Sequence, residues 1–219
     1  MKKSFLILGM GRFGATLAAT LCQLGHEVMA VDANAARVDM IKDLVTHAVQ
    51  ANICDERAVS QLGVRNFDCV AVCVGDDIRA SVLAVVMCKE YGAQYVVCKA
   101  SDSLHEKLLY KTGADKVLQP ERESGARLAH ALVSQSVLDF IELSDTYSIS
   151  EIRMPAPWVD KTLAELNVRA KYGLSVIAIR RAGEIVVAIE PNAPLQAGDV
   201  LVVVGANESL AKLNGLKKA

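Results

Sequence analysis

The sequence predicts an α/β fold in which a doubly wound parallel sheet is followed by a smaller α+β domain. Short apolar runs alternate with amphipathic helical patterns through residue 134, and runs such as Phe5–Leu8 and Cys69–Val74 are apolar at successive positions. Continuous apolar strands are typical of a parallel sheet that helices cover on both faces. The repeated strand–helix order favours right-handed crossovers, and therefore a doubly wound sheet.

We expect strands and helices to alternate strictly in this first part. The strands are expected at Phe5–Leu8, Val28–Val31, Ala48–Ala51, Cys69–Val74, Tyr95–Cys98 and Lys116–Leu118. The helices are expected at Phe13–Leu24, Ala35–Leu44, Glu56–Leu62, Ile78–Tyr91, Ser103–Thr112 and Ser124–Val133. Gly25 and Gly92 directly follow two of these helices, at the position where a glycine commonly ends a helix.

The pattern changes after residue 137, because most of the 5 prolines and none of the 6 cysteines lie beyond it. Strands are expected there at Ser148–Arg153, Ser175–Arg180, Ile185–Ile189 and Val200–Val204, and short helices near Leu163–Val168 and Glu208–Leu213. The turn from Arg181 to Glu184 contains Gly183 and predicts a hairpin. We therefore expect two domains, at 1–137 and 138–219.

The composition argues against two classes of protein. The chain of 219 residues has 24 Lys and Arg against 25 Asp and Glu, so it lacks the basic surface of a nucleic-acid binder. No apolar run reaches the roughly 18–20 residues that span a bilayer, and the start does not resemble a signal peptide. The cysteines form no Cys-x-x-Cys pair and are expected to be buried thiols in a reducing compartment. We expect a cytoplasmic protein.

The strongest motif is Gly9-Met-Gly-Arg-Phe-Gly14, between a predicted strand and a predicted helix. In a Rossmann-like site the first glycine permits a tight turn, the second lets the backbone approach phosphate, and the third allows close helix–strand packing. The helix then presents N–H groups and a positive dipole end to the phosphate. Asp32 ends the second strand, where its carboxylate can hold an adenosine ribose and would repel a 2′-phosphate, so NADP is disfavoured.

Other polar side chains follow strands at the edge where open parallel sheets bind ligands. They are Asn52, Asp76, Asp77, Lys99 and Glu121. Each could instead be a solvated loop residue, and Asp77 could cap the helix expected to start at Ile78. Arg12 is more informative, because backbone N–H groups already serve a pyrophosphate. A guanidinium beside them suits a ligand with more phosphate charge, such as ATP.

Groups that could carry out catalysis are harder to find. The second domain contains no histidine. His26 and His47 lie where strands begin, at the opposite edge of the sheet from the expected ligand site. His105 and His130 lie in helical patterns that predict surface or partly buried neutral side chains. No Ser-His-Asp, paired-carboxylate or Cys-His arrangement is recognisable. The residues therefore favour a nucleotide sensor that is not an enzyme. A redox sensor that binds NAD(H) and a small NAD-dependent oxidoreductase remain as alternatives.

Several segments resemble the RCK (regulator of potassium conductance) family. In the first domain they are Gly9–Gly14, Val31–Asn34, Thr46–Asn52, Leu62–Asp68 and Gly113–Glu121, and in the second Val159–Leu163, Arg169–Gly173 and Pro194–Val202. Together they cover nearly the whole chain. One N-domain and one C-domain in a chain this short is similar to the cytosolic regulatory subunits of Ktr potassium uptake systems.

This resemblance implies an octameric ring, a tetramer of dimers, docked on the cytoplasmic face of a potassium-translocating membrane dimer, with ATP favouring the active ring and ADP the inactive one. It implies that Arg12 meets the terminal phosphates and Asp32 the ribose, and that Glu121 reaches a neighbouring subunit's nucleotide and helps to hold a cation such as Mg²⁺. The expected nucleotide-binding residues are Gly9, Met10, Gly11, Arg12, Phe13, Gly14, Asp32, Asn34, Asn52, Lys99 and Glu121.

Two interpretations of the second domain remain open. It could be a dimerisation module in which exposed strand edges and the apolar residues Leu174, Val176 and Ile177 pack against a twin. The resemblance also implies a cleft between twins that binds a cyclic dinucleotide such as cyclic di-AMP. Arg169, Tyr172 and Ile177 are the candidate contacts for that ligand.

Overall fold

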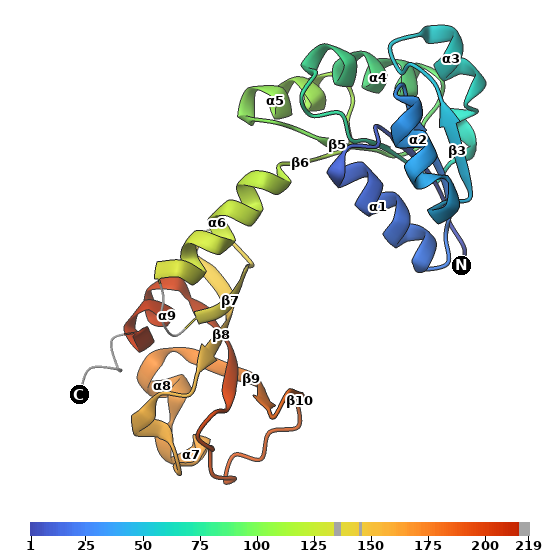
Figure 1. The fold of residues 1–219 in the computed structure, drawn as a ribbon. Coiled ribbons are helices and arrows are strands. Elements are labelled where there is room, and N and C mark those ends of the chain that lie inside the picture. Colours follow the sequence, from blue (N-terminus) through green and yellow to red (C-terminus); the bar gives the residue numbers. More distant parts are fainter. Residues whose placement is uncertain (134–136, 145, 215–219) are drawn as a thin grey trace. The chain divides into compact units, whose positions relative to one another are not determined.

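The computed structural model of the protein describes residues 1–133, 137–144 and 146–214. Contacts divide the chain into two compact units, Met1–Glu121 and Arg122–Ala219, and we describe each unit by itself (Figure 1). The domains expected at 1–137 and 138–219 stay a prediction. Within the described residues, no helix combines the length and the apolar character that crossing a bilayer requires.

The first unit is built on a parallel sheet. Its strands are β1 (Ser4–Leu8), β2 (Glu27–Asp32), β3 (His47–Gln50), β4 (Cys69–Val72), β5 (Val96–Lys99) and β6 (Lys116–Leu118). They run in the order β3-β2-β1-β4-β5-β6, so the order reverses beside β1, the strand that precedes the glycine motif. This confirms the predicted doubly wound sheet, and the crevice at such a reversal is where open α/β sheets bind ligands.

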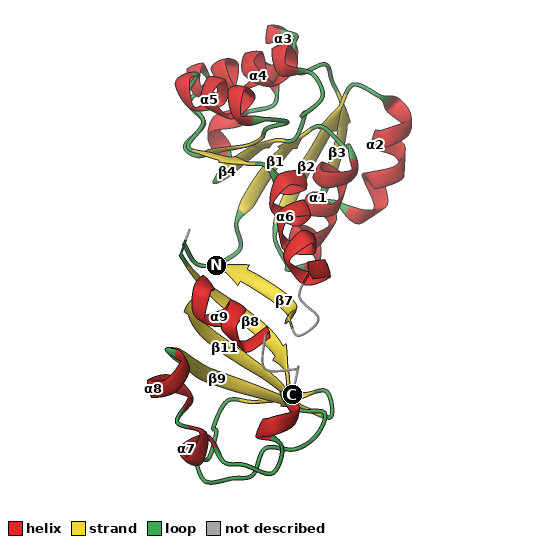
Figure 2. Cartoon of the chain, turned by 90° about the vertical axis from the view of Figure 1, so that its left-hand side faces the viewer, coloured by secondary structure: helices red, strands yellow, loops and turns green. Residues whose placement is uncertain are grey.

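Helices cover both faces of this sheet. They are α1 (Arg12–Gln23), α2 (Ala35–Ile41), α3 (Glu56–Gln61), α4 (Ile78–Glu90) and α5 (Ser103–Lys111), with short 3₁₀ turns at Lys42–Leu44 and Val64–Asn66. Figures 1 and 2 show α1 and α2 on one side of the sheet and α3, α4 and α5 on the other. Gly25 and Gly92 have φ of +87° and +84° after α1 and α4, which confirms their predicted helix-ending role.

Successive residues of β1 face different helices. Ile7 packs in a cluster with Ala18 of α1 and Ile41 of α2, whereas Leu6 and Leu8 pack in a second cluster with residues of α4 and α5. Leu6, Ile7 and Leu8 are fully buried, so both faces of this part of β1 are covered, which explains why its sequence is apolar at successive positions.

Helix α6 (Pro120–Val133) begins earlier than the predicted Ser124. A proline suits the first position of a helix, because its fixed φ is helical and its missing N–H would have no partner there. Glu121 therefore lies in the first turn of a helix rather than in a loop after β6, and the helix geometry fixes the direction of its side chain.

The second unit is built on an antiparallel sheet. Its strands are β7 (Val137–Glu142), β8 (Tyr147–Arg153), β9 (Leu174–Arg181), β10 (Glu184–Val186) and β11 (Val200–Ala206), in the order β10-β9-β11-β8-β7. Its helices are α7 (Leu163–Leu166), α8 (Val168–Tyr172) and α9 (Asn207–Asn214), and a 3₁₀ turn spans Ala156–Trp158. The core lies between the sheet and α8 and α9, where Leu174, Leu201 and Leu213 are buried.

Three expectations for this unit were wrong. Strand β7 was not predicted, because it is defined by its pairing with β8 rather than by a strong local pattern. The expected strand Ile185–Ile189 ends at Val186, after which Ile189 N–H turns back to the carbonyl of Val187, 3.0 Å away. The helix expected near Leu163–Val168 is two short helices, divided at Asn167, which has φ of +45°. The predicted hairpin is confirmed, with Glu184 paired to Arg181.

The cysteines are free thiols, as the absence of paired motifs predicted, but their burial varies. Cys73, Cys88 and Cys98 are buried, and burial raises the pKa of each to about 12. These thiols are therefore protonated and unreactive at neutral pH. Cys54 is exposed, so the expectation of a buried thiol was wrong for this residue.

His105 is completely buried, contrary to the predicted surface or partly buried position. Its Nδ1 accepts from the N–H of Ser101 at 3.2 Å, so Nε2 carries the hydrogen that bonds the Ser81 hydroxyl at 2.7 Å. That hydroxyl donates to the carbonyl of Ile78 at 2.9 Å. The neutral ring therefore joins α5 to the start of α4 with every polar atom satisfied. The side chain of His130 lies outside the described part of the structure.

Acid is expected to destabilise the first unit through His105. Burial lowers the pKa of His105, against the opposing charge of Asp102, so the unfolded chain binds the proton more readily than the folded one. The contribution of His105 to the free energy of unfolding is therefore fully present above the ordinary histidine pKa of about 6.5, and it is lost as the pH drops below that value. Urea unfolding between pH 5 and 8 measures this slope. His105→Asn should flatten it, whereas the exposed His47→Asn should not; equal slopes in all three proteins would contradict the assignment.

Candidate nucleotide-binding site

The glycine motif forms the turn between β1 and α1, and each glycine has a different local reason to be there. Gly9 has φ of +99°, which disfavours other residues. A Cβ on Gly14 would lie 2.0 Å from the carbonyl oxygen of Gly9, so only glycine lets α1 pack this closely. A Cβ on Gly11 would meet nothing within 4 Å. The three positions thus have the geometry that the motif predicted: a tight turn, an open approach and a close packing contact.

The open space at Gly11 coincides with the start of α1. Gly11 is the N-cap residue and supplies no side-chain hydrogen bond, so the first N–H groups of this 12-residue helix have no cap. Uncapped N–H groups and the positive end of the helix dipole favour an anion. The site therefore offers a phosphate both room and donors.

Asp32 lies at the end of β2 and is buried. One of its oxygens accepts from the N–H of Met10 at 2.6 Å, and the other from the N–H of Asn34 at 2.8 Å. The carboxylate thereby fixes the glycine loop to the end of β2. Because each carboxylate oxygen can accept a second hydrogen bond, the predicted bond to a ribose remains compatible with these contacts.

Three charged side chains gather at the ends of β5 and β6 and the start of α1. The ammonium of Lys99 lies 2.5 Å from the carboxylate of Glu121, and the aliphatic stem of Lys99 runs against Gly75. The hydrogen bond from Lys99 lowers the pKa of Glu121, and the positive charge of Arg12 adds to the effect. Lys99 is mostly buried, whereas Glu121 is largely exposed. The structure thus brings Arg12, which was predicted to meet the terminal phosphates, close to Lys99 and Glu121, two other residues expected to bind the nucleotide.

The other predicted residues make local contacts. Asn34 caps α2 by accepting from Ala36 N–H, and Asn52 accepts from Cys54 N–H. Asp77 caps α4, which confirms the structural alternative for that residue. The side chain of Met10 is buried and that of Phe13 packs against the same cluster, so these two residues can reach a ligand chiefly through their backbone.

Two residues at the site were missed from the sequence. Arg37 lies 3.5 Å from Asp32 and is half exposed, so it adds a cation beside the predicted ribose position. Gly75 provides the surface against which the stem of Lys99 lies. Neither has a local signal, because one is an ordinary helix residue and the other a single glycine after a strand. Both are recognised only from their neighbours in space.

A nucleotide phosphate fits the groups at this site, since it would meet uncapped N–H groups and the cationic side chains of Arg12 and Lys99. A resident metal ion fits less well. Among the residues that the structure describes, no three His, Cys, Asp or Glu side chains are placed to hold one. A cation at Glu121 would therefore need phosphate oxygens as its further ligands.

The second unit contains a cavity of about 340 Å³ between α7, α8 and the start of β9. Arg169 lines it, together with Asn167 and Val176. The other two candidates for a cyclic dinucleotide lie elsewhere: Tyr172 packs on Trp158, with ring centroids 5.4 Å apart, and Ile177 does not line the cavity. Leu174 is fully buried, so its predicted role as an exposed dimer contact was wrong.

Comparisons with known proteins agree with this architecture. The TrkA-N domain model matches residues 5–120, and the TrkA-C domain model matches residues 149–217. The chain is 39% identical to Ktr system potassium uptake protein C of Bacillus subtilis, over 97% of this chain and 96% of that protein. It is 38% identical to Ktr system potassium uptake protein A of the same organism, over 96% and 95%.

A solved structure of the GsuK channel bound to NAD has the same fold, with a TM-score of 0.70 at 19% identity over 100% of this chain and 40% of that one. Fold and sequence identity agree. The chain belongs to the RCK family of TrkA-N and TrkA-C domain proteins that includes the Ktr system potassium uptake proteins.

Proposed function

We propose that this chain is the nucleotide-sensing regulatory subunit of a potassium uptake system, with ATP favouring the active state and ADP the inactive state. The observation that carries the proposal is the cluster of Arg12, Lys99 and Glu121 beside an open, uncapped helix N-terminus. The high identity to Ktr system potassium uptake proteins over nearly the full chain supports the link to potassium.

The charged cluster suggests how the number of phosphates is sensed. In the structure, Lys99 is paired with Glu121. A terminal phosphate competes with that carboxylate for Lys99 and accepts from Arg12, because both cations prefer the more highly charged oxygens. ATP and ADP differ only at the γ-phosphate, so these contacts must distinguish them. A ligand changes the ratio of two states tenfold for each 1.4 kcal/mol by which it prefers one.

Glu121 provides a route from the nucleotide to the assembly. A bare carboxylate is repelled by a triphosphate, so once Lys99 turns to phosphate, Glu121 needs a cation such as Mg²⁺ or another position. Glu121 is largely exposed, which allows it to reach a nucleotide in a neighbouring subunit.

Exposed leucines support an oligomer. Leu104 and Leu108 lie one turn apart on α5, and Leu128 and Leu132 lie one turn apart on α6; all four are exposed. Apolar pairs at this spacing form stripes that suit helix packing. We propose that such stripes join copies of the chain into an octameric ring, attached to the cytoplasmic face of the membrane through a potassium-translocating subunit.

A cyclic dinucleotide is a second proposed effector. The cavity beside Arg169 is lined by the apolar residues Leu163 and Val176 and by the polar residues Asn167 and Ser175. A guanidinium suits the phosphates of cyclic di-AMP, and the apolar wall suits an adenine.

NAD(H) sensing is the alternative function, and Asp32 is the observation that favours it. A carboxylate at the end of β2 suits the ribose of NAD as well as that of ATP, and the similar GsuK channel has been solved with NAD. Arg12 argues for the adenylates, because a pyrophosphate carries no terminal phosphate for it to bind.

Parallel titration calorimetry with ATP, ADP, NAD and NADH tests the function. We expect both adenylates to bind with micromolar Kd and NADH to bind more weakly. Light scattering should then show different quaternary geometry with ATP and with ADP. Tighter binding of NADH than of ADP would favour the redox sensor, and hydride transfer to any substrate would establish an enzyme.

A further inference from the structure

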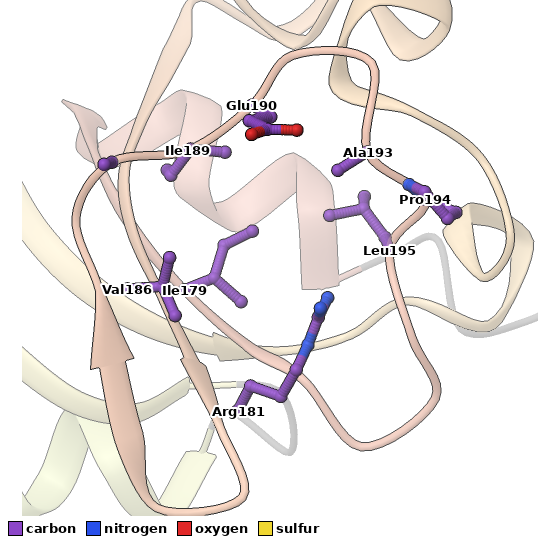
Figure 3. A pocket seen from close by; sticks show the side chains of 9 residues that line it. Ile179, Arg181, Val186, Ile189, Glu190, Ala193, Pro194 and Leu195 are labelled. Atoms are coloured by element: carbon purple, nitrogen blue, oxygen red, sulfur yellow. The ribbon is translucent and has the colours of Figure 1, made fainter.

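The second unit contains another cavity, to which neither nucleotide proposal gives a role. It measures about 230 Å³ and lies between β9, β10 and the chain that follows β10 (Figure 3). Most of its lining side chains are apolar, among them Ile179, Ile189 and Leu195. The two charged ones are Arg181 and Glu190. The residues that line the cavity beside Arg169 are all different.

Main-chain hydrogen bonds fix the walls of this cavity. Leu195 and the segment Asp160–Lys161 exchange two of them, at 2.8 and 2.9 Å, and Ala193 N–H donates to the carbonyl of Glu190 at 3.0 Å. Leu195 and Ile179 are themselves buried in the core of the unit. The fold itself therefore holds the walls of the cavity, which lowers the free-energy cost of ordering them when a ligand binds.

Arg181 is held in place by a buried carboxylate. Its Nε and Nη2 donate to the two oxygens of Asp199 at 2.8 and 2.7 Å, and Asp199 is 2% exposed. A guanidinium has five N–H groups, so this pair leaves the hydrogens of Nη1 free. Within the described part of the chain, no residue accepts from them. Figure 3 shows the guanidinium directed toward the apolar side chains of the cavity.

The charges indicate which ligand the cavity suits. Asp199 already neutralises Arg181, and Glu190 lies at the other end of the apolar lining (Figure 3). The walls thus carry one net negative charge, which disfavours a simple anion. A guanidinium with free donors at one end and a carboxylate at the other suit a zwitterion.

We propose that this cavity binds a free α-amino acid with an apolar side chain. The ligand's carboxylate accepts from Nη1 of Arg181, its ammonium donates to Glu190, and its side chain packs against Ile179, Ile189 and Leu195. The volume of about 230 Å³ lies below the roughly 300 Å³ at which pockets for larger ligands begin, so it suits one amino acid better than a nucleotide. The chain would then respond to an amino acid as well as to nucleotides.

Titration calorimetry of the full chain with L-leucine, L-isoleucine and L-valine tests this proposal. We expect at least one to bind, and 4-methylpentanoate and 3-methylbutylamine, which each lack one charged group, to bind at least about tenfold more weakly, a loss of about 1.4 kcal/mol. Glu190→Gln should weaken binding to a similar extent. Glu184→Gln is the matched control, because that exposed carboxylate lies on β10 outside the cavity.

A second variant, Ala188→Leu, fills the cavity from an exposed position and should abolish binding without unfolding the chain. Absence of binding by all three amino acids overturns the proposal, and so does equal binding of leucine and 4-methylpentanoate. Unchanged affinity in Glu190→Gln also overturns it. Titration of the same samples with ADP shows whether the nucleotide site is intact. Absence of amino-acid binding can therefore be distinguished from absence of nucleotide binding.

Discussion

Gly14→Ala is expected to destabilise the first unit by at least about 3 kcal/mol, at the upper end of the usual cost of overpacking. The new Cβ would lie 2.0 Å from the carbonyl oxygen of Gly9 and 3.1 Å from Cβ of Cys73. The nearest atom belongs to the backbone, so no side-chain rotation relieves the clash. α1 must move away from β1, and nucleotide binding is lost with it. Urea unfolding followed by circular dichroism measures the change in the free energy of unfolding.

Gly11→Ala is the matched comparison, with the same added methyl group in the same loop. A Cβ there meets nothing within 4 Å, and the backbone has φ of −69°, which alanine adopts freely. We expect a change in stability below about 1 kcal/mol, the usual scale of an N-cap change. The methyl group occupies the space through which phosphate reaches the helix N-terminus, so binding of both ATP and ADP should fall sharply. A stable Gly11→Ala protein with normal nucleotide affinity would contradict the placement of the phosphates.

Arg12→Ala is expected to remove the preference for ATP while it leaves ADP binding close to normal. Hydrogen bonds to charged groups contribute about 1.5–3 kcal/mol, so ATP affinity should fall roughly 10- to 100-fold. ADP should lose much less, because its phosphates reach the backbone N–H groups at the start of α1. Titration calorimetry with both nucleotides measures the two constants separately.

The control for this variant is Arg65→Ala. Arg65 is also exposed, and it lies in the 3₁₀ turn before β4, at the opposite end of the strands from the site. It should change neither affinity. If Arg12→Ala weakens ATP and ADP equally, the guanidinium binds the phosphates common to both, and it does not sense the γ-phosphate. If Arg12 drives the switch, light scattering of the Arg12→Ala protein should show the same quaternary geometry with ATP as with ADP.

Local patterns were sufficient for most helices and strands of the first unit. Its strands are apolar because both faces are covered, and most of its helices are followed by glycines whose positive φ a sequence can suggest. The glycine motif and Asp32 were recognised for the same reason: the turn, the close packing contact and the acidic residue follow each other at fixed spacing. Expectations failed where the partner is distant in sequence. Strand β7 depends on β8, the burial of His105 depends on α4, and Leu174 is buried by contacts with its own unit's core.

The sequence by itself therefore determined the doubly wound sheet, the glycine-rich turn between β1 and α1, and the family of the chain. Only the tertiary structure decided which side chains meet: Asp32 with the N–H of Met10, Lys99 with Glu121, and Arg181 with Asp199. The physical reason is that periodicity along a chain shows which face of an element is buried or exposed. The identity of the group opposite that face depends on how separate elements pack against each other. Ion pairs and buried hydrogen bonds between distant residues form only at those contacts.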